Sequence, residues 1–336
     1  MSGVVKAVVI REPGGPERLQ LVDQPLRDPG PDEVVIRTKA MAVSRADVLI
    51  RKGVYAWMPP LPASPGNELT GVIEDLGGNV QSLRRGDAVL LSARDLPVRG
   101  GCYAEAVCVP ADAVYRLPQG MGFDEAVVLP TYLVAYAMYR NAGGRAGAKA
   151  VFISGVSGSI GNALSQLAKA DGLRVIGTAG SPKKAEHARR AGVDHVINYK
   201  TENVVQRVLE LTDGRGTDLA FDHIIGPRFA DLFDLVADFG TLTFFNIHAA
   251  MPEEDVFRKM CALSTRSLTL SCFNIHTYDH HVDDRRRLMK ELIDLLAAGA
   301  IRPHIGARLT LRQAAQAHAL LEAGSVEGKI ILAPDL

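Results

Sequence analysis

One stretch of the sequence decides the fold, and it reads Val151-Phe152-Ile153-Ser154-Gly155-Val156-Ser157-Gly158-Ser159-Ile160-Gly161. Its β-branched start predicts a strand, its glycines and serines a tight turn, and the apolar spacing from Ile160 through Leu164 and Leu167 a helix. Strand, glycine turn and helix are the setting of a dinucleotide-binding loop. Gly158 lets the backbone approach a pyrophosphate, and Gly161 lets the helix pack on its strand. The helix N-terminus then favours the phosphate charge.

A second strand, predicted over 173–178, follows soon after the helix, as a βαβ unit requires. Units that bind NAD carry Asp or Glu near the end of this strand to hold the ribose hydroxyls. No acid stands there, and Pro182-Lys183-Lys184 comes next. Two cations beside hydroxyl groups suit a 2′-phosphate, which predicts NADPH. The alternative is that Lys183 and Lys184 are solvated charges opening a helix, where cations are disfavoured.

Composition excludes several classes of function. The chain has 336 residues, 47% of them hydrophobic, which is enough for two domains with cores of their own. Its 38 basic and 38 acidic residues cancel, so no overall field attracts nucleic acid or an anionic membrane. The N-terminus lacks the features of a signal peptide, and no apolar run has the length of a membrane span. We therefore expect a cytoplasmic protein that binds neither nucleic acid nor membrane.

The cysteines support the same location, because their spacing matches neither a zinc module nor a disulfide framework. Reduced thiols are expected at Cys102, Cys108, Cys261 and Cys272.

The pattern of predicted secondary structure changes near residue 124. Before it, short apolar runs alternate with Gly- and Pro-rich turns, which predicts an antiparallel, barrel-like domain. After it, strands and helices alternate, which predicts a doubly wound parallel sheet. Its strands are expected at 151–154, 174–178, 195–198, 219–225, 241–245 and 268–273. Two helices (285–298 and 311–321) and a closing strand (328–332) complete the chain.

Ordered motifs along nearly the whole chain resemble the zinc-free medium-chain dehydrogenase/reductases, in the quinone oxidoreductase (zeta-crystallin-like) branch. The matching stretches are 47–55, 65–73, 86–89, 101–105, 155–161, 166–169, 191–199, 214–218, Asp222 and 328–330. The resemblance implies an α/β protein in which a Rossmann domain (127–271) is inserted in a GroES-like antiparallel β-barrel domain (1–126 and 272–336). It also implies an active cleft between the domains and a homodimer.

The resemblance also implies that zinc is absent. Zinc-dependent relatives carry Cys where Ser44 stands and His where Asn67 stands, and neither Ser nor Asn is a usual zinc ligand. Three residues depart from the branch's own pattern at the nicotinamide end: Ser44 replaces Asn, Val134 replaces Thr and His223 replaces Ser. These departures predict a specialised pocket.

Cofactor contacts follow residue by residue from the resemblance. Ser157, Gly158, Ser159 and Ile160 are expected at the pyrophosphate. Thr178, Lys183 and Tyr199 are expected around the adenosine and 2′-phosphate. The nicotinamide end would be lined by Ser44, Val134, His223, Phe245, Asn246, Phe273, Asn274 and Lys329. Two alternatives stay open: His223 can be a structural histidine, and Lys329 can be a surface lysine before the last strand.

The expected reaction is hydride transfer from NADPH to a quinone or an α,β-unsaturated carbonyl, whose π system spreads the charge that forms. The cofactor provides the hydride, and the protein orients the reactants and excludes water. Tyr55 is the candidate proton donor by position, and the pocket is expected to include Trp57, Asn67 and Phe273. Alternatively, Tyr55 and Trp57 only pack the cleft.

Two other functions remain open at this point. One is an enoyl-thioester reductase of polyketide or fatty-acid synthesis, which the run 47–55 also resembles. The other is a non-enzymatic NADPH-binding protein.

Overall fold

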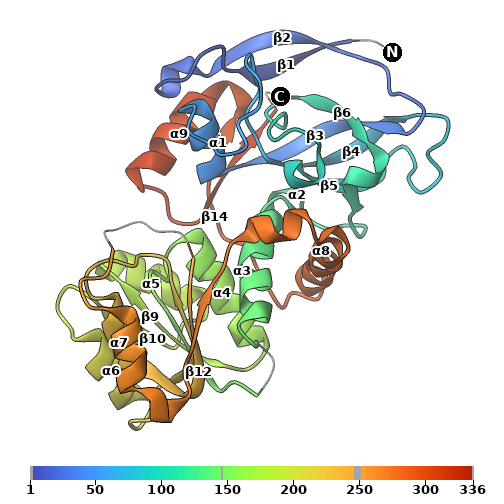
Figure 1. Ribbon diagram of the computed structural model, residues 1–336. Coiled ribbons are helices and arrows are strands. Elements are labelled where there is room, and N and C mark those ends of the chain that lie inside the picture. The colour runs from blue at the N-terminus through green and yellow to red at the C-terminus, as the bar shows by residue number, and fades with distance from the viewer. Residues whose placement is uncertain (1–2, 145–146, 246–250, 335–336) are drawn as a thin grey trace. The chain divides into compact units, whose positions relative to one another are not determined.

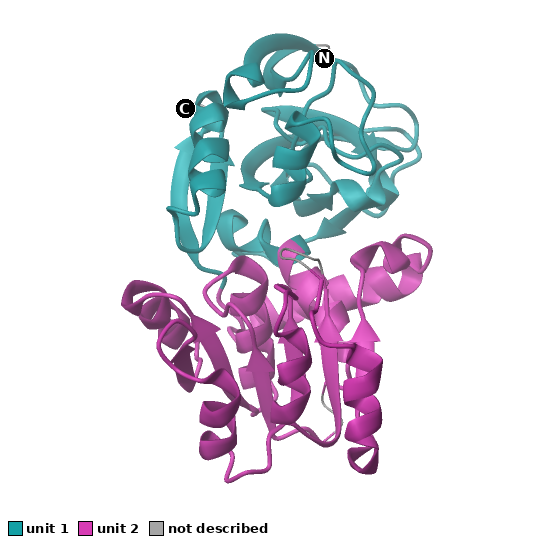
Figure 2. Cartoon of the chain, turned by 60° about the vertical axis from the view of Figure 1, so that its left-hand side comes forward, with its two compact units in different colours: residues 1–130, 303–336 teal, residues 131–302 magenta. Residues whose placement is uncertain are grey.

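The computed structural model describes residues 3–144, 147–245 and 251–334, and it divides into two compact units (Figures 1 and 2). Unit 1 consists of Met1–Pro130 and Pro303–Leu336, and unit 2 is the continuous stretch Thr131–Arg302. No helix in the described ranges is long and apolar enough to cross a membrane.

Unit 2 is built on a six-stranded sheet in the order β10-β9-β8-β11-β12-β13, with every pair parallel. Its strands are β8 (Ala150–Ile153), β9 (Arg174–Ala179), β10 (His195–Asn198), β11 (Thr217–Asp222), β12 (Val236–Phe244) and β13 (Thr269–Cys272). Its helices are α3 (Leu129–Asn141), α4 (Ser159–Ala170), α5 (Pro182–Arg190), α6 (Val204–Leu211), α7 (Val256–Ala262) and α8 (Val282–Ala297). The alternation confirms the predicted doubly wound sheet.

The centre of this sheet is apolar because its parallel strands are covered on both faces. Phe152, Ile176 and Ala220 of three adjacent strands are buried in one cluster. The glycine turn after β8 crosses close to β9 at Gly177, where an added Cβ would lie 2.0 Å from Val156 Cγ1. The absence of a side chain at Gly177 therefore lets the turn pack against the sheet.

Unit 1 contains a seven-stranded sheet, in which β14-β15-β3-β4-β5-β7 are consecutive and β6 also pairs with β3, together with a two-stranded sheet of β1 and β2. Its strands are β1 (Gly3–Val9), β2 (Gln20–Leu26), β3 (Glu33–Val43), β4 (Glu68–Leu76), β5 (Ala88–Ser92), β6 (Ala106–Pro110), β7 (Val114–Arg116), β14 (Ile305–Thr310) and β15 (Lys329–Ala333). Its helices are α1 (Arg45–Arg51), α2 (Phe123–Ala126) and α9 (Ala314–Ala323).

This sheet is antiparallel apart from the β14–β15 pair, which is parallel. The β14 strand was not predicted. Helix α9 lies between β14 and β15 in the chain, so the two form a β-α-β unit. Strand β15 stands between β14 and β3, which joins the C-terminal segment to the N-terminal one within a single sheet.

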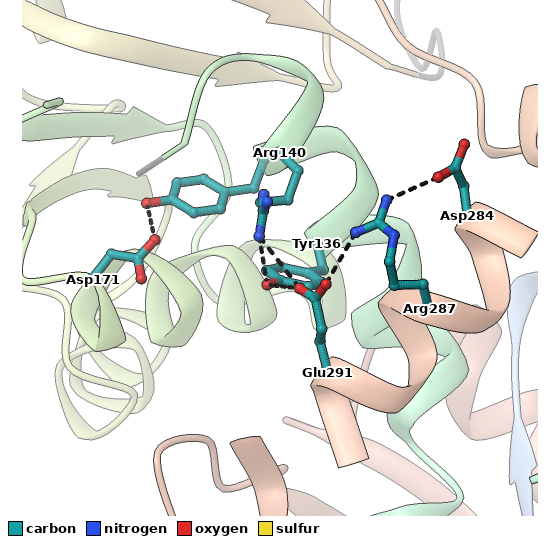
Figure 3. Close-up of polar contacts among 7 residues, drawn as sticks. Tyr136, Arg140, Asp171, Asp284, Arg287 and Glu291 are labelled. Carbon is teal, nitrogen blue, oxygen red and sulfur yellow. Dashed lines mark hydrogen bonds and ion pairs between the residues drawn. The ribbon is translucent and has the colours of Figure 1, made fainter. Parts of the chain in front are cut away.

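The boundaries of the units differ from the expected ones. The chain passes into unit 2 after Pro130 rather than after residue 126, and it leaves after Arg302 rather than before residue 272. Strand β13 pairs with β12, which places it in the parallel sheet. Helix α8 is joined to α3 through Glu291, whose Oε2 accepts a hydrogen bond from Tyr136 at 2.6 Å (Figure 3). Residues 272–302 thus belong with unit 2 because their partners lie there.

Candidate functional site

The loop between β8 and α4 is held by β9. Gly155 N donates to Thr178 Oγ1 at 3.0 Å, and Val156 N donates to the Thr178 carbonyl at 3.1 Å. Helix α4 begins after its N-cap residue Gly158, which has no side chain to cap the first turn. Amides at such an end lack partners within the helix, and together with the helix dipole they form an anion-binding site. The loop therefore fits the pyrophosphate of a dinucleotide.

The glycines of this loop have different local surroundings. A Cβ at Gly161 would lie 2.5 Å from the Gly155 carbonyl oxygen and 2.8 Å from Val156 Cα, so only glycine fits there. A Cβ at Gly158 would meet nothing closer than 3.5 Å. Gly158 and Ser159 are exposed, and Ser157 and Ile160 are half-buried. Gly161 thus permits the packing of the loop, whereas Gly158 leaves an open surface in front of the helix end.

Residues at the carboxyl ends of β9 and β10 fit the adenosine end of a cofactor. Lys183 is exposed in the first turn of α5, which holds no acid. Tyr199 follows β10 and is 52% exposed, and a Cβ at Gly180 would lie 2.4 Å from its hydroxyl. Thr178 is buried, and its hydroxyl already accepts the Gly155 amide. Its position indicates that Thr178 stabilises the loop between β8 and α4.

His223 lies against the glycine loop. A Cβ at Gly155 would be 2.7 Å from His223 Cε1, and the His223 and Phe245 rings are 5.6 Å apart. The turn that presents His223 is shaped by Asp222, whose carboxylate accepts the amides of Ile224 and Ile225. The predicted contact Asn246 lies outside the described residues.

The remaining predicted residues of unit 2 occupy varied environments. Val134 is half-buried on α3, and Phe273 is buried after β13 with its ring 6.4 Å from that of Tyr278. Asn274 accepts the His276 amide at 2.9 Å and so caps a 3₁₀ helix, η6 (Ile275–Asp279). This cap gives Asn274 a local structural role that the sequence did not predict.

In unit 1, two predicted residues share one buried carboxylate. Asp47 on α1 accepts hydrogen bonds from the Ser44 amide and hydroxyl, each at 2.7 Å. It also accepts from Asn67 Nδ2 at 2.7 Å and from the Gly66 amide at 3.2 Å. Asp47 was not among the predicted site residues, although the spacing of Ser44 and Asp47 is that of a helix capping box, which the structure confirms.

A buried ion pair lies close to this carboxylate. Lys329, the first residue of β15, places Nζ 3.2 Å from Oε2 of Glu68, the first residue of β4. Lys329 is 5% exposed, so the alternative of a surface lysine is wrong. Burial raises the pKa of Glu68 and of Asp47, and the Lys329 charge opposes both shifts. The lysine thus stabilises two carboxylates that burial disfavours.

Two further buried groups extend this arrangement. The Tyr103 hydroxyl lies 3.5 Å from Asp47 Oδ2 and 3.2 Å from His318 Nε2, and the two rings meet edge-to-face. Burial, with a smaller effect of the Arg51 charge, lowers the pKa of His318 to about 4. Gly66 has a φ of +92°, and a Cβ there would be 2.4 Å from the Tyr103 ring. We call Ser44, Asp47, Asn67, Glu68, Tyr103, His318 and Lys329 the Asp47 cluster.

Tyr55 and Trp57 lie on the loop after α1. Their rings are 5.8 Å apart. Tyr55 is half-buried against a small apolar cluster that contains Ile50, while Trp57 is 43% exposed. The ring of Tyr55 is therefore packed against the protein, whereas that of Trp57 on the same loop is exposed.

Comparisons with known proteins match both parts of the chain. The family described as "Alcohol dehydrogenase GroES-like domain" matches residues 30–119, and "Zinc-binding dehydrogenase" matches residues 191–332. A quinone oxidoreductase of Pseudomonas aeruginosa is 32% identical over 96% of this chain and 97% of its own length. One of Rattus norvegicus is 28% identical over 98% of each chain.

Solved structures agree with this match. The Escherichia coli quinone oxidoreductase complexed with NADPH has a TM-score of 0.80 and 26% identity, over 98% of this chain and 100% of its own. A structure described as an NAD-dependent alcohol dehydrogenase has a TM-score of 0.85 and 31% identity, with the same coverage. The GroES-like match and these neighbours confirm the predicted fold class.

Proposed function

Since the chain belongs to the quinone oxidoreductase branch of the medium-chain dehydrogenase/reductases, we propose that it uses NADPH to reduce a quinone or an α,β-unsaturated carbonyl. The observation that carries this proposal is the glycine loop, with the uncapped α4 behind it and Lys183 after an acid-free β9. The relatives from Pseudomonas aeruginosa, Rattus norvegicus and Salmonella typhimurium are named quinone oxidoreductases, which favours this function over an enoyl-thioester reductase or a non-enzymatic protein.

We further propose that the reaction proceeds without zinc, although one matching family is described as zinc-binding. The two positions where zinc-dependent relatives carry Cys and His hold Ser44 and Asn67, and both donate hydrogen bonds to Asp47. An amide nitrogen that donates to a carboxylate has no lone pair to offer a metal. Elemental analysis that found one zinc per chain would overturn this part of the proposal.

In this scheme NADPH, when bound, supplies the hydride, and the residues of the chain hold the reactants. The amides at the start of α4 would bind the pyrophosphate, and Lys183 would bind the 2′-phosphate. Tyr55 would donate a hydrogen bond to the oxygen that gains negative charge as the hydride arrives. The electron-accepting π system of the substrate spreads this charge, so little acid assistance is needed.

The test is NADPH oxidation, followed by absorbance, across simple quinones, alkyl enones and enoyl thioesters, with NADH in parallel. We expect turnover of quinones or enones with NADPH. Activity confined to thioesters would place the protein in acyl-chain synthesis instead. Tight NADPH binding with no turnover of any acceptor would favour a non-enzymatic function.

Replacing Lys183 with alanine should lower the preference for NADPH over NADH. A hydrogen bond to a charged group contributes about 1.5–3 kcal/mol, so we expect kcat/KM for NADPH to fall about tenfold or more, with little change for NADH. Arg189→Ala is the control, because it removes a cation of the same exposed helix at its other end. Equal losses with both cofactors would contradict a role at the 2′-phosphate.

Replacing Tyr55 with phenylalanine should lower kcat about 100-fold, because losing one hydrogen-bond donor to a developing oxyanion costs roughly that factor. The control is Tyr115→Phe, which removes a buried tyrosine hydroxyl that donates to Asp95 at 2.9 Å in the same unit. Steady-state kinetics with a simple quinone would measure both variants. If Tyr55→Phe keeps kcat within twofold, Tyr55 only packs the loop.

The assembly and location are also proposals. Strand β13 ends its sheet, with no partner beyond it in the described ranges, and such an edge can pair with a second copy of the chain. We therefore propose a homodimer, which sedimentation showing a monomer at micromolar concentration would contradict. The four cysteines are free thiols, which supports the reducing cytoplasm. Cell fractionation that recovered the protein outside the cytoplasm would contradict this location.

A further inference from the structure

The Asp47 cluster ends in a buried histidine nitrogen without a partner. His318 on α9 is fully buried, and its Nε2 lies 3.2 Å from the Tyr103 hydroxyl. Its Nδ1 has no hydrogen-bond partner among the residues that the structure describes. Buried polar atoms are nearly always hydrogen-bonded, so an orphan of this kind has a physical reason.

A second orphan atom belongs to Arg51, whose charge acts on the same histidine. Arg51 Nη1 is buried and has no partner within the described part of the chain, although Nη2 donates to Glu322 Oε2 at 2.8 Å and Nε donates to the Gly14 carbonyl at 3.0 Å. Glu322 follows His318 by one turn of α9, and its side chain is 29% exposed. A buried water bound to each of these two atoms would supply the missing partner, and the partly exposed Glu322 carboxylate would connect the Arg51 end to solvent.

On its Nε2 side, His318 is connected to Ser44 through Tyr103 and Asp47. The Tyr103 hydroxyl is 3.5 Å from Asp47 Oδ2, and the same oxygen accepts from Ser44 Oγ at 2.7 Å. Ser44 is half-buried, whereas Asp47 and Tyr103 are buried. An imidazole, a phenol, a carboxyl and a hydroxyl can each accept a proton on one side and release one on the other. The connected groups therefore have the chemistry of a relay from His318 to Ser44.

We propose that His318, Tyr103 and Asp47 form a proton relay that delivers to Ser44 the proton consumed in quinone reduction. The proposal rests on the proposed function, because it places the reacting quinone oxygen beside Ser44. Quinone, NADPH and one proton give hydroquinone and NADP⁺, so each turnover needs one proton from solvent. Tyr103 and His318 act through Ser44 and are positioning residues.

Each transfer in the relay replaces the proton that the previous one removed. Ser44 Oγ gives its proton to the quinone oxygen and takes one from Asp47. Asp47 is then reprotonated by the Tyr103 hydroxyl, which receives a proton from His318 Nε2. His318 Nδ1 takes the replacement from water beside Arg51 and Glu322. No relay group is oxidised or reduced, and one proton passes from solvent to product.

The electrostatics of the cluster agree with this sequence of transfers. Burial raises the pKa of Asp47, while its hydrogen bonds from Ser44 and Asn67 and the Lys329 charge oppose the shift. A raised pKa favours the carboxyl form that can donate to Ser44. His318, with a pKa of about 4, is neutral near pH 7, so a proton enters at one nitrogen as another leaves from the other.

The test compares Tyr103→Phe with the control Tyr115→Phe defined above. Each removes one buried tyrosine hydroxyl near a carboxylate of unit 1, but only Tyr103 is linked to Ser44 through Asp47. The rate of NADPH oxidation in a single turnover with a simple quinone is measured, together with the dissociation constant of NADPH. For Tyr103→Phe we expect a rate at least tenfold lower with an unchanged dissociation constant, and for Tyr115→Phe a rate within twofold of the unmodified protein.

A Tyr103→Phe rate within twofold of the unmodified rate would overturn the relay, and so would equal losses in both variants. If Tyr103→Phe does not fold, the unmodified protein is assayed in mixtures of H₂O and D₂O. A multi-proton relay predicts a curved dependence of the rate on deuterium content, whereas a linear dependence would overturn it. Absence of quinone reduction by the unmodified protein would overturn the proposed function itself, which separates the two failures.

Discussion

Replacing Lys329 with methionine is expected to lower the free energy of unfolding by about 3–5 kcal/mol, because it leaves a buried carboxylate without its counter-charge. Lys329 and Glu68 are both buried, and their charged atoms are 3.2 Å apart. Burial and, to a smaller extent, the nearby Asp47 carboxyl group raise the pKa of Glu68, and the Lys329 charge opposes this shift. Methionine keeps most of the side-chain length, so the loss reports the charge rather than a cavity.

Urea denaturation would measure this loss, and two further variants define its origin. Lys329→Met combined with Glu68→Gln should recover much of the stability, since neither partner then carries a charge. Arg37→Met is the matched control, because its 2.9 Å ion pair with Glu74 is exposed and should contribute about 1 kcal/mol or less. A similar loss in Lys329→Met and Arg37→Met would contradict the importance of burial.

The pH dependence of the Lys329→Met loss has a definite sign. Without the lysine, the pKa of Glu68 in the folded chain rises further above its unfolded value of about 4.3. The folded chain then binds more protons than the unfolded one, so stability falls as the pH rises through that interval. The loss relative to the unmodified protein should be smaller at pH 5 than at pH 8. An equal loss at both values would show that Glu68 does not need the counter-charge.

Replacing Gly161 with alanine is expected to disrupt both the glycine loop and cofactor binding. The added methyl group would lie 2.5 Å from a backbone oxygen and 2.8 Å from a backbone carbon, neither of which can move without the loop. Overpacking of this kind costs about 1–3 kcal/mol of stability. Displacement of the amides that face the pyrophosphate should also lower NADPH affinity by about tenfold or more, measured by fluorescence titration.

Gly158→Ala is the informative control for Gly161→Ala. Its Cβ meets nothing closer than 3.5 Å, and its φ of −76° suits any residue, so the melting temperature should hold. A loss of NADPH affinity without a loss of stability would then locate the pyrophosphate against Gly158. An unchanged melting temperature and affinity in Gly161→Ala would contradict the tight packing of α4 against the turn at Gly155 and Val156.

Local patterns in the sequence predicted much of unit 2, because the strand, turn and helix of a βαβ unit all lie within a few dozen consecutive residues. The glycine loop and the alternating strands are examples. Strands β2, β7 and β14 were missed. Each stands at the end of its sheet, β7 has only three residues, and β2 is polar and contains a proline. Unit 2 extends to Arg302 rather than to residue 271 because α8 finds its partner, Tyr136 of α3, through a tertiary contact that no local pattern shows.

The Asp47 cluster could not be assembled from the sequence for the same reason. Its members come from α1, the starts of β4 and β15, α9 and the loop before β6, and only the fold brings them together. Ser44 and Asn67 were singled out through a resemblance, but the carboxylate that they share was not. The burial of Lys329 in the structure rules out a surface lysine. No local sequence pattern predicts that a charged residue is buried.

The position of β15 between β14 and β3 has a consequence for biosynthesis. Unit 2 is continuous in the chain, so all of it has been synthesised while the last strand of unit 1 is still missing. A nascent chain therefore holds residues 41–43 of β3 without their β15 partner until Ile330–Leu332 leave the ribosome, whereas residues 33–37 are already paired with β6. Because unpaired edges recruit other strands, chains that terminate before Lys329 should be those most prone to aggregate in the cell.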